Sequence, residues 1–279
     1  MPEHVVTYPP GSLAEFVKDG RWAVTTTPTI ETQLEVDDPK AEKARNIFGE
    51  DFFGKEAIHT FEEKCRAKGI AVSFEIPRVP MHLDERQLKA AKAEEAEGKE
   101  RMVTLRPEWM VVNGERKPVN ILTLRDLFEQ ETTRPDPKKP GQTETVVTYD
   151  NNPFGDGPVF RGIRGGIEGD NFAHEQMKPG YGLPTKEAIP DSWDKTWNDQ
   201  QQLFGKGEKR REAVETVWDS LIYYAVTGEK VLADRWELTN SQTSDGLNRV
   251  VVRWLSAGLT VHYWHPGVPL SDIGVCSSL

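Results

Sequence analysis

The chain has 279 residues, of which 37% are hydrophobic and 29% are charged, a composition that can bury a core beneath a charged surface. Its formal net charge is −10, from 35 Lys and Arg against 45 Asp and Glu. This acidic balance argues against binding to nucleic acid or to anionic lipid, because both contacts require clustered Lys and Arg.

Targeting and redox signals are sparse. No run of about 18 apolar residues occurs, so we expect no membrane-spanning helix. The first 16 residues lack a basic segment followed by an apolar one, so we expect no signal peptide and, by default, a cytoplasmic protein. The two cysteines, Cys65 and Cys276, lie far apart, which fits a reducing compartment or an indifferent one and excludes a disulfide scaffold.

The first half of the chain predicts short mixed elements. Residues 12–19 predict a brief helix, and residues 54–68 predict a longer one because apolar side chains recur there at helical spacing. Residues 70–77 alternate like a strand and end at a proline. Residues 84–98 have high helix propensity and few large apolar side chains, which predicts a helix with a solvated surface.

Two strands and a turn are expected next. Residues 101–107 and 108–112 predict strands, and Asn113-Gly114 predicts a hairpin turn because both residues tolerate positive φ. Residues 123–131 predict another short helix. Three prolines and a glycine then interrupt every periodicity between residues 132 and 142. We place a domain boundary here, between an N-terminal accessory domain of unknown role (1–140) and a C-terminal domain (141–279).

The second half changes character. Residues 150–181 are rich in Gly and Asn and predict a long ordered loop, and Asp191 predicts the cap of a helix carrying Trp193 and Trp197. The strongest periodic element is residues 208–227, a helix with one continuous apolar face that ends at Gly228. Short strands follow, so this half predicts two helices and then a meander of antiparallel strands.

The last forty or so residues have an unusual composition. No Glu follows Glu237 and no Lys follows Lys230. Long charged side chains are depleted both in cores and at contact surfaces. Aromatic, small polar and imidazole side chains predominate instead, a mixture typical of recognition surfaces. An aromatic sheet face packed under the glycine-rich loop explains the composition equally well, so both interpretations stay open.

The order of these elements carries a resemblance. Residues 235–279 resemble the C-terminal end of C-type-lectin-fold variable proteins that are diversified by retroelements. The matching segments are RWELTNSQTSDG, NRVVVRWLSAG, LTVHYWHPGVPLSD and IGVCSS, and the two preceding helices fit the same fold. Separately, GLPTKEAIPDSWDKTW and the GVCSS ending look like a group of uncharacterised bacterial proteins that differ mainly near the C-terminus.

The resemblance implies a fold and a function. The fold is α+β, with a C-terminal C-type-lectin-like domain of two helices and short antiparallel strands after a small mixed α/β N-terminal domain. The function is non-catalytic binding of a protein or another macromolecule through a diversified surface, without a cofactor, a metal or a nucleic-acid partner, and without direct membrane insertion. The oligomeric state stays open.

The resemblance also implies which side chains form that surface. They are Arg253, Trp254, Ser256, Thr260, His262, Tyr263, Trp264, His265, Val268, Leu270, Ser271 and Asp272. The implied scaffold residues are Gly258, Val261, Pro266, Gly274 and Val275. We expect the rings of Trp254, Tyr263 and Trp264 to point outward and to become buried on binding.

Two alternative functions stay open. The same fold hosts the formylglycine-generating enzyme, so an enzyme that uses Cys276 is the first alternative. A structural subunit of a phage or surface assembly, with its tryptophans buried between protomers, is the second. Metal sites are disfavoured: Trp197-Asn198-Asp199 lacks the partner triplet of calcium-dependent lectins, and strand alternation places His262 and His265 on opposite faces.

Overall fold

The computed structural model describes residues 38–135, 138–139, 141–161, 167–233 and 235–279, with the backbone alone at 132 and 134. It also describes the backbone of two paired strands, β1 (Leu13–Phe16) and β2 (Trp22–Thr25). The chain divides into two compact units, Met1–Asp37 and Asp38–Leu279. The prediction of a helix over residues 12–19 is wrong for residues 13–16, which form the strand β1. Residues 12 and 17–19 lie outside the described part.

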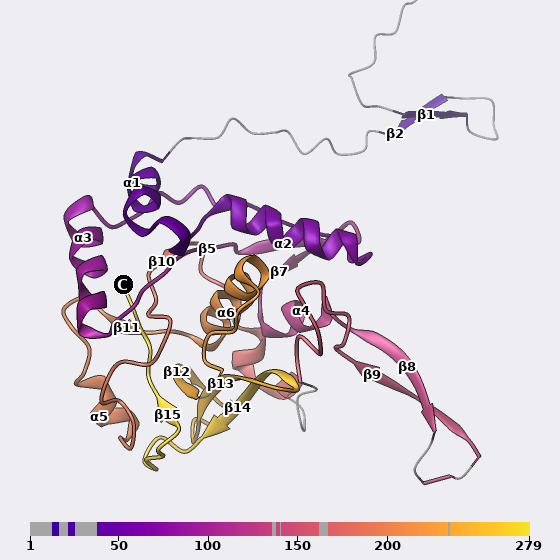
Figure 1. The fold of residues 1–279 in the computed structure, drawn as a ribbon. Coiled ribbons are helices and arrows are strands. Elements are labelled where there is room, and N and C mark those ends of the chain that lie inside the picture. Colours follow the sequence, from indigo (N-terminus) through magenta and orange to yellow (C-terminus); the bar gives the residue numbers. More distant parts are fainter. Residues whose placement is uncertain are drawn as a thin grey trace, which may run out of the picture. The chain divides into compact units, whose positions relative to one another are not determined.

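The unit Asp38–Leu279 is a mixed α+β fold, as expected (Figure 1). Its α-helices are α1 (Pro39–Phe48), α2 (Lys55–Ala67), α3 (Glu85–Ala93), α4 (Ile121–Asp126), α5 (Trp197–Gln201) and α6 (Ala213–Thr227). Short 3-10 helices cover Gly49–Asp51, Glu94–Glu97, Ile167–Gly169 and Asn171–His174. Among the described residues, none of the helices is long and apolar enough to cross a bilayer.

The strands of this unit form several small sheets. The strands are β3 (Phe52–Phe53), β4 (Val72–Phe74), β5 (Val103–Arg106), β6 (Trp109–Val112), β7 (Glu115–Pro118), β8 (Gln130–Pro135), β9 (Thr143–Thr148), β10 (Gly180–Gly182), β11 (Lys209–Arg210), β12 (Trp236–Gln242), β13 (Arg249–Leu255), β14 (Gly258–Trp264), β15 (Ile273–Gly274) and β16 (Ser277–Ser278). Their orders are β10-β5-β3, β4-β6-β7, β8-β9, β11-β16 and β14-β13-β12-β15.

The local signals of the first half mostly predicted these elements. α2 and α3 confirm the two helices, and α3 begins with the capping box of Asp84 and Gln87. Asn113 and Gly114 have φ values of 52° and 83° and join β6 to β7, as predicted. α4 begins earlier than expected, at Ile121, because the Asn120 side chain accepts a hydrogen bond from the backbone of Thr123.

The proline-rich segment near residue 140 lies within a β-hairpin that the sequence did not predict. Strands β8 and β9 pair over six residues on each side of it. Figure 1 shows this hairpin standing out from the rest of the unit. We call it the β8–β9 arm.

A single core spans the expected domain boundary. Phe61 precedes the boundary and Phe154 follows it, and their ring centroids lie 4.7 Å apart. Phe74 and Trp218 also come from opposite sides of the boundary, and their ring centroids lie 5.0 Å apart. All four belong to one cluster of buried side chains. The described residues on the two sides of residue 140 therefore share a core, and their division into an accessory and a ligand-binding domain stays a prediction.

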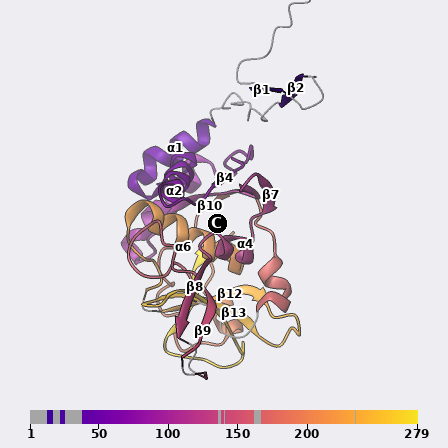
Figure 2. The same ribbon diagram turned by 90° about the vertical axis from the view of Figure 1, so that its right-hand side faces the viewer.

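Helix α6 lies at the centre of this core. Figures 1 and 2 show it between α2 and the sheet of β12–β14. Every residue from 213 to 225 is buried, so the helix is enclosed on all sides rather than on one apolar face. It begins at Ala213, later than expected, because Lys209–Arg210 pair with Ser277–Ser278 as a strand.

The segment before α6 differs from its prediction. Asp191 has a φ of 61° and Asp194 a φ of 53°, so the backbone turns here and Trp193 is not helical. Thr196 caps the short helix α5, which begins at Trp197. The prediction of one helix carrying Trp193 and Trp197 is therefore wrong.

The C-terminal sheet confirms the predicted meander in part. β12, β13 and β14 pair antiparallel in succession, but β15 returns to pair parallel with β12. The register of β12 shifts between Leu238 and Gln242, a β-bulge or a similar irregularity. The chain therefore closes back on the sheet instead of extending it.

Candidate ligand-binding surface

The two faces of the C-terminal sheet have different surroundings. Val250, Val252 and Trp254 of β13 belong to the central core, and Val251 between them belongs to a smaller cluster. The face away from α6 is called the outer face. Its small cluster contains Leu238, Val251 and Ile273, with Trp197, Trp236, Trp264 and Leu270 packed against them.

The loop between β14 and β15, residues 265–272, is held by hydrogen bonds. The indole N–H of Trp264 donates to the carbonyl of Val268 over 2.9 Å. The backbone N–H of Trp197 donates to the carbonyl of Pro266, also over 2.9 Å. The loop is therefore fixed both to the strand that leads into it and to the start of α5.

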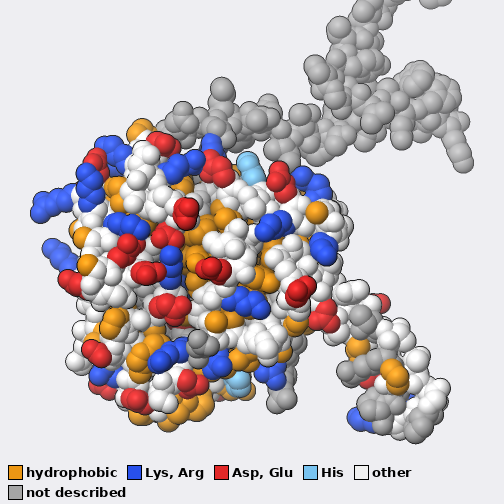
Figure 3. All heavy atoms as spheres, viewed as in Figure 1, with side chains coloured by type: hydrophobic (Ala, Val, Ile, Leu, Met, Phe, Trp, Pro, Cys, Tyr) orange, Lys and Arg blue, Asp and Glu red, His pale blue; other side chains and the backbone are white. Residues whose placement is uncertain are grey.

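Nine of the expected binding residues lie on β13, on β14 and in the loop that follows β14. Tyr263 lies opposite Val250 on the α6 side of the sheet, whereas His262 lies opposite Val251 on the outer face. Tyr263 is 44% exposed and Val268 is 45% exposed, high values for apolar side chains. We define the β14 surface as Arg253, His262, Tyr263, Trp264, His265, Val268, Leu270, Ser271 and Asp272, of which Arg253, Trp264, Leu270 and Asp272 are half-buried and the others exposed. In Figure 3 hydrophobic side chains gather along the lower margin of the molecule, over β14 and β15.

Polar and ring contacts involve Arg253, Asp272 and His262 of the β14 surface. Arg253 lies 3.5 Å from the carboxylate of Asp272, and its guanidinium lies 5.6 Å from the ring centroid of Trp236. The Trp236 ring in turn meets the His262 ring edge-on at 6.4 Å. The sequence did not point to Trp236 as a residue of this surface. It directly precedes the buried Glu237 at the start of β12, so strand alternation turns the two side chains to opposite faces.

The two histidines present hydrogen-bond donors. The backbone N–H of Tyr263 donates to Nδ1 of His262 over 2.7 Å, and that of Gly267 donates to Nδ1 of His265 over 3.1 Å. A ring nitrogen that accepts carries no proton, so these hydrogen bonds assign the proton of each neutral ring to Nε2. Both rings therefore offer an Nε2–H to a ligand.

Three expected binding residues lie elsewhere. Trp254 is 1% exposed and packs on Tyr224, with 5.1 Å between ring centroids, so the expectation of an outward ring is wrong for this residue. The reason is strand alternation, which turns it inward with Val250 and Val252. Thr260 is also buried, and its hydroxyl donates to the carbonyl of Gly258.

Ser256 is exposed but separate from the others. It lies in the turn that joins β13 to β14, whereas Trp264 lies at the far end of β14. A strand of seven residues spans about 20 Å at about 3.3 Å per residue. Ser256 therefore belongs to a different part of the surface.

The implied scaffold residues fit tight positions. Gly258 has a φ of 105°, and a Cβ there would come within 2.7 Å of the backbone of Phe160 and Arg161. A Cβ on Gly274 would overlap the Trp193 ring, and Val261 and Val275 are buried. Pro266 is half-buried, and its carbonyl accepts the hydrogen bond that fixes the loop.

A buried ion network beneath the sheet was not predicted. Arg106 on β5 donates to Glu215 over 2.6 Å and to Asp219 over 2.7 Å, both on α6. Arg211 donates to Asp219 over 2.9 Å and to Glu237 on β12. All five side chains are 5% exposed or less. The network ties β5, α6 and β12 together, and two acidic residues four apart in an apolar helix were the signal for it.

The charges of this network shift its pKa values. Burial alone would raise the pKa of Asp219, but Arg106 and Arg211 outweigh that effect and hold the pKa below its ordinary value of 3.8. For Glu237 burial prevails over the attraction of Arg211, and its pKa is raised. Asp219 is therefore a stable carboxylate, while the charge of Glu237 is only partly compensated.

The cysteines are poor candidates for chemistry. Cys276 is fully buried, and burial raises the pKa of its thiol well above the ordinary value. Burial likewise raises the pKa of the Cys65 thiol to about 12. A buried, protonated thiol is a weak nucleophile. Within the residues that the structure describes, no group of three or more His, Cys, Asp or Glu is arranged to hold a metal ion.

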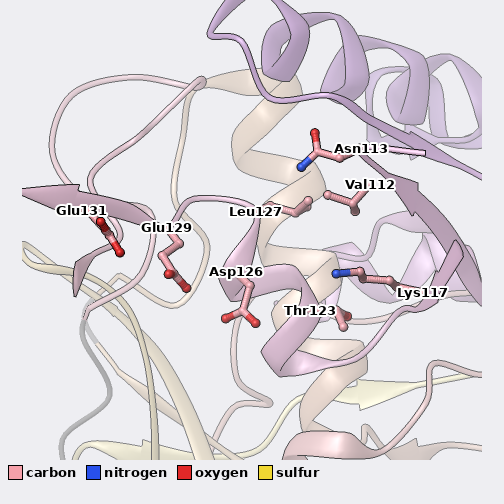
Figure 4. A pocket seen from close by; sticks show the side chains of 8 residues that line it. All are labelled: Val112, Asn113, Lys117, Thr123, Asp126, Leu127, Glu129 and Glu131. Atoms are coloured by element: carbon pink, nitrogen blue, oxygen red, sulfur yellow. The ribbon is translucent and has the colours of Figure 1, made fainter. Parts of the chain in front are cut away.

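An open pocket of about 340 Å³ lies elsewhere, between the β6–β7 hairpin, α4 and the start of β8 (Figure 4). Its lining residues are Val112, Asn113, Lys117, Thr123, Asp126, Leu127, Glu129 and Glu131. Three carboxylates and one lysine are therefore among the lining side chains. No expected binding residue lines this pocket.

Comparison with protein-family models, with curated proteins and with solved structures finds no match to this chain.

Proposed function

We propose that this chain is a non-catalytic binding protein that recognises a protein ligand through the β14 surface. The observation that carries the proposal is the exposure of Tyr263 and Val268 beside a loop that hydrogen bonds hold in place. A preordered surface loses little conformational entropy on binding, and exposed rings supply contact area. The Nε2–H groups of His262 and His265 add donors for backbone or carboxylate oxygens of a ligand.

We also propose that residues 141–279 form a C-type-lectin-like domain of the retroelement-diversified kind. Support comes from the order of elements, with α5 and α6 before the β12–β14 meander and short closing strands after it. The absence of Lys and Glu from the last forty or so residues is a second support. A sheet with a buried inner face lets outer side chains vary while the fold is kept.

The net charge of the chain and the burial of Cys276 narrow the classes of ligand and of function. The net charge of −10 disfavours nucleic acid and anionic lipid. The burial of Cys276 disfavours an enzyme that uses its thiol. The proposal therefore includes no cofactor and no catalytic residue.

A capture experiment tests the proposal. Immobilised wild-type chain is compared with the double variant Tyr263→Ser/Val268→Ser in a lysate of the source organism, and the bound proteins are identified by mass spectrometry. Residues Ile76 and Val79 have similar exposure, 37% and 42%, and lie outside the β14 surface, so Ile76→Ser/Val79→Ser is the matched control.

We expect a protein that binds the wild type and the control but not the β14 variant. Its Kd, measured by calorimetry, should rise at least about tenfold in the β14 variant, since central apolar contacts contribute more than about 1.4 kcal/mol. Identical capture by all three chains would refute the assignment of the surface.

A further inference from the structure

The outer face of β13 carries two arginines in different surroundings. Arg249 and Arg253 alternate with Val251 along the strand, so these three side chains lie on the face away from α6. Arg253 pairs with Asp272. Arg249 is half-buried, and within the described part of the chain it forms no ion pair. This face therefore carries a positive charge that no carboxylate contacts.

Glu212 attracts the charge of Arg249 but is held by other groups. Its carboxylate accepts a hydrogen bond from the side-chain amide of Asn240 over 2.7 Å and another from the hydroxyl of Ser241 over 3.0 Å. Burial of Arg249 outweighs the attraction and lowers the pKa of its guanidinium. A carboxylate brought into contact with Arg249 would therefore stabilise its charged form.

One edge of the Arg249 guanidinium has hydrogen-bond donors without acceptors. Nη1 donates to the carbonyl of Asn240 over 2.6 Å, whereas Nε and Nη2 have no hydrogen-bond partner among the residues described. Neither nitrogen is one of the buried polar atoms that lack a partner, so both remain open to solvent. Together they form a planar fork that matches the two oxygens of a carboxylate.

Other arginines of this chain use the same edge to hold a carboxylate. Nε and Nη2 of the buried Arg106 donate to Asp219 over 3.1 and 2.7 Å. Nε and Nη2 of the exposed Arg116 donate to Glu75 over 2.6 and 2.9 Å. Arg249 presents this fork without the carboxylate that it holds elsewhere in the chain.

A second arginine adds positive charge beside Arg249. The guanidinium groups of Arg210 and Arg249 lie 4.8 and 4.4 Å from the centroid of the Trp197 ring. Arg210 is 4% exposed, and it donates to the backbone carbonyls of Leu238 and Trp197 rather than to a carboxylate. Burial lowers its pKa to about 9. An anion near this ring is therefore attracted by two guanidinium groups.

This site adjoins the β14 surface. Arg249 lies directly opposite Trp264 in the register of β13 and β14, and His262 follows on the same face opposite Val251. The rings of Trp197 and Trp264 both pack against the small cluster of the outer face. A protein that covers Trp264 and His262 therefore also reaches the fork of Arg249.

We propose that the protein ligand places the carboxylate of an Asp or Glu side chain on the Nε–Nη2 edge of Arg249, beside Trp264. The inference rests on the proposed function for the source of the carboxylate, and it deepens that function by naming an acidic segment as the ligand. Arg210 attracts the carboxylate through its charge and does not touch it. The site gives a chain of net charge −10 a local means of binding an acidic partner.

Nitrogen-15 NMR of the full chain tests the site without the protein ligand. The probes are N-acetyl-glutamate amide and N-acetyl-glutamine amide, which has nearly the same shape but no charge. The Nε–H signal of Arg249, assigned by its loss in Arg249→Lys, should shift progressively with the glutamate probe and stay in place with the glutamine probe. The signal of Arg116 should stay in place with both, because Glu75 occupies its edge.

Three results of this titration overturn the proposal. The first is an Arg249 signal that does not respond to the glutamate probe. The second is an equal response to sodium chloride, which would show screening alone. The third is a larger response to inorganic phosphate at the same concentration, which would assign the edge to a phosphate group.

The captured protein tests whether the ligand supplies the carboxylate. Arg249→Gln should raise its Kd at least about tenfold, because a charged contact at the interface is lost. Arg116→Gln also removes an arginine stacked on a tryptophan and should leave the Kd unchanged. Circular dichroism checks that both variants are folded.

The failure of this inference differs from failure of the proposed function. An unchanged Kd in Arg249→Gln, with the expected loss in Tyr263→Ser/Val268→Ser, overturns the carboxylate contact and leaves the β14 surface standing. Identical capture by the wild type and the β14 variant, with a specific NMR response at Arg249, refutes the β14 surface and supports the carboxylate site.

Discussion

At the scale of single residues, the environments of Trp254 and Tyr263 are opposite although they lie on neighbouring strands. Trp254 fills the space between the sheet and Tyr224, whereas Tyr263 reaches solvent at the end of β14. Composition placed both in one aromatic group. The strand register places both on the α6 side of the sheet, since Tyr263 lies opposite Val250 and Trp254 lies opposite Leu259. They differ in their position along the strands, because Tyr263 lies next to the last residue of β14, where the core no longer covers it, and this local pattern does not show how far the core extends.

Replacement of these two rings should have very different effects. Trp254→Ala should lower the free energy of unfolding by about 3–5 kcal/mol, because it leaves a cavity in the core. Tyr263→Ser should change it by less than about 1 kcal/mol, as for an exposed site. Urea unfolding of both variants against the wild type measures the difference, and similar losses would show that Tyr263 belongs to the core.

Asp219 should make the stability depend on acid pH. Its pKa in the folded chain lies below 3.8, so its contribution is fully present above that pH and is lost as the pH falls through the folded-state pKa. Asp219→Asn should cost about 3–5 kcal/mol at neutral pH, because it leaves Arg106 and Arg211 short of a buried partner.

Thermal unfolding between pH 7 and pH 3 checks this prediction. The Tm of Asp219→Asn should fall less than that of the wild type in the most acidic part of the range, since the variant has no carboxylate to protonate there. Parallel curves with a constant offset would contradict the assigned role of Asp219.

The pairs in this network could not have been predicted from the sequence. Arg106 and Asp219 are 113 residues apart, and nothing local indicates which arginine meets which carboxylate. The acidic residues of α6 were visible in an apolar helix, but a solvated face would explain them equally well. Only the packing of α6 on all sides requires that they be paired.

At the scale of elements, residues with strong local preferences determine the parts that the sequence predicted. The capping box at Asp84, the Asn113-Gly114 turn and the alternation of β13 each act within a few residues. The β8–β9 arm was missed because its prolines suggested a linker, although TETVVT alternates and favours a strand. Pairing between strands across a long turn leaves a weaker local signal.

Gly258 at the start of β14 should be sensitive to substitution. Its positive φ and the close backbone of Phe160 and Arg161 leave no space for a Cβ, so Gly258→Ala should destabilise the start of β14 by about 1–3 kcal/mol. Gly267→Ala is the matched control, because its Cβ would meet only the His265 ring at 3.3 Å. Guanidinium unfolding measures the loss of stability in both variants. Equal losses would be inconsistent with this packing.

At the scale of the whole molecule, the shared core predicts that the two halves depend on each other. Phe61 and Phe74 come from one side of residue 140 and pack on Phe154 and Trp218 from the other. Residues 141–279 expressed alone should therefore lack a cooperative thermal transition, whereas residues 38–279 should show one. Calorimetry of both fragments measures this, and cooperative unfolding of the shorter fragment would favour two independent domains.

The proposed function requires that the exposed end of the C-terminal sheet, and no other region, meets the ligand. Sequence composition indicated the region, and the structure separates its exposed members from Trp254 and Thr260. Hydrogen-exchange mass spectrometry of the full chain, alone and with the captured protein, tests this requirement most directly. We predict slower exchange in peptides covering residues 262–272; unchanged exchange there, with protection elsewhere on the chain, would contradict the account.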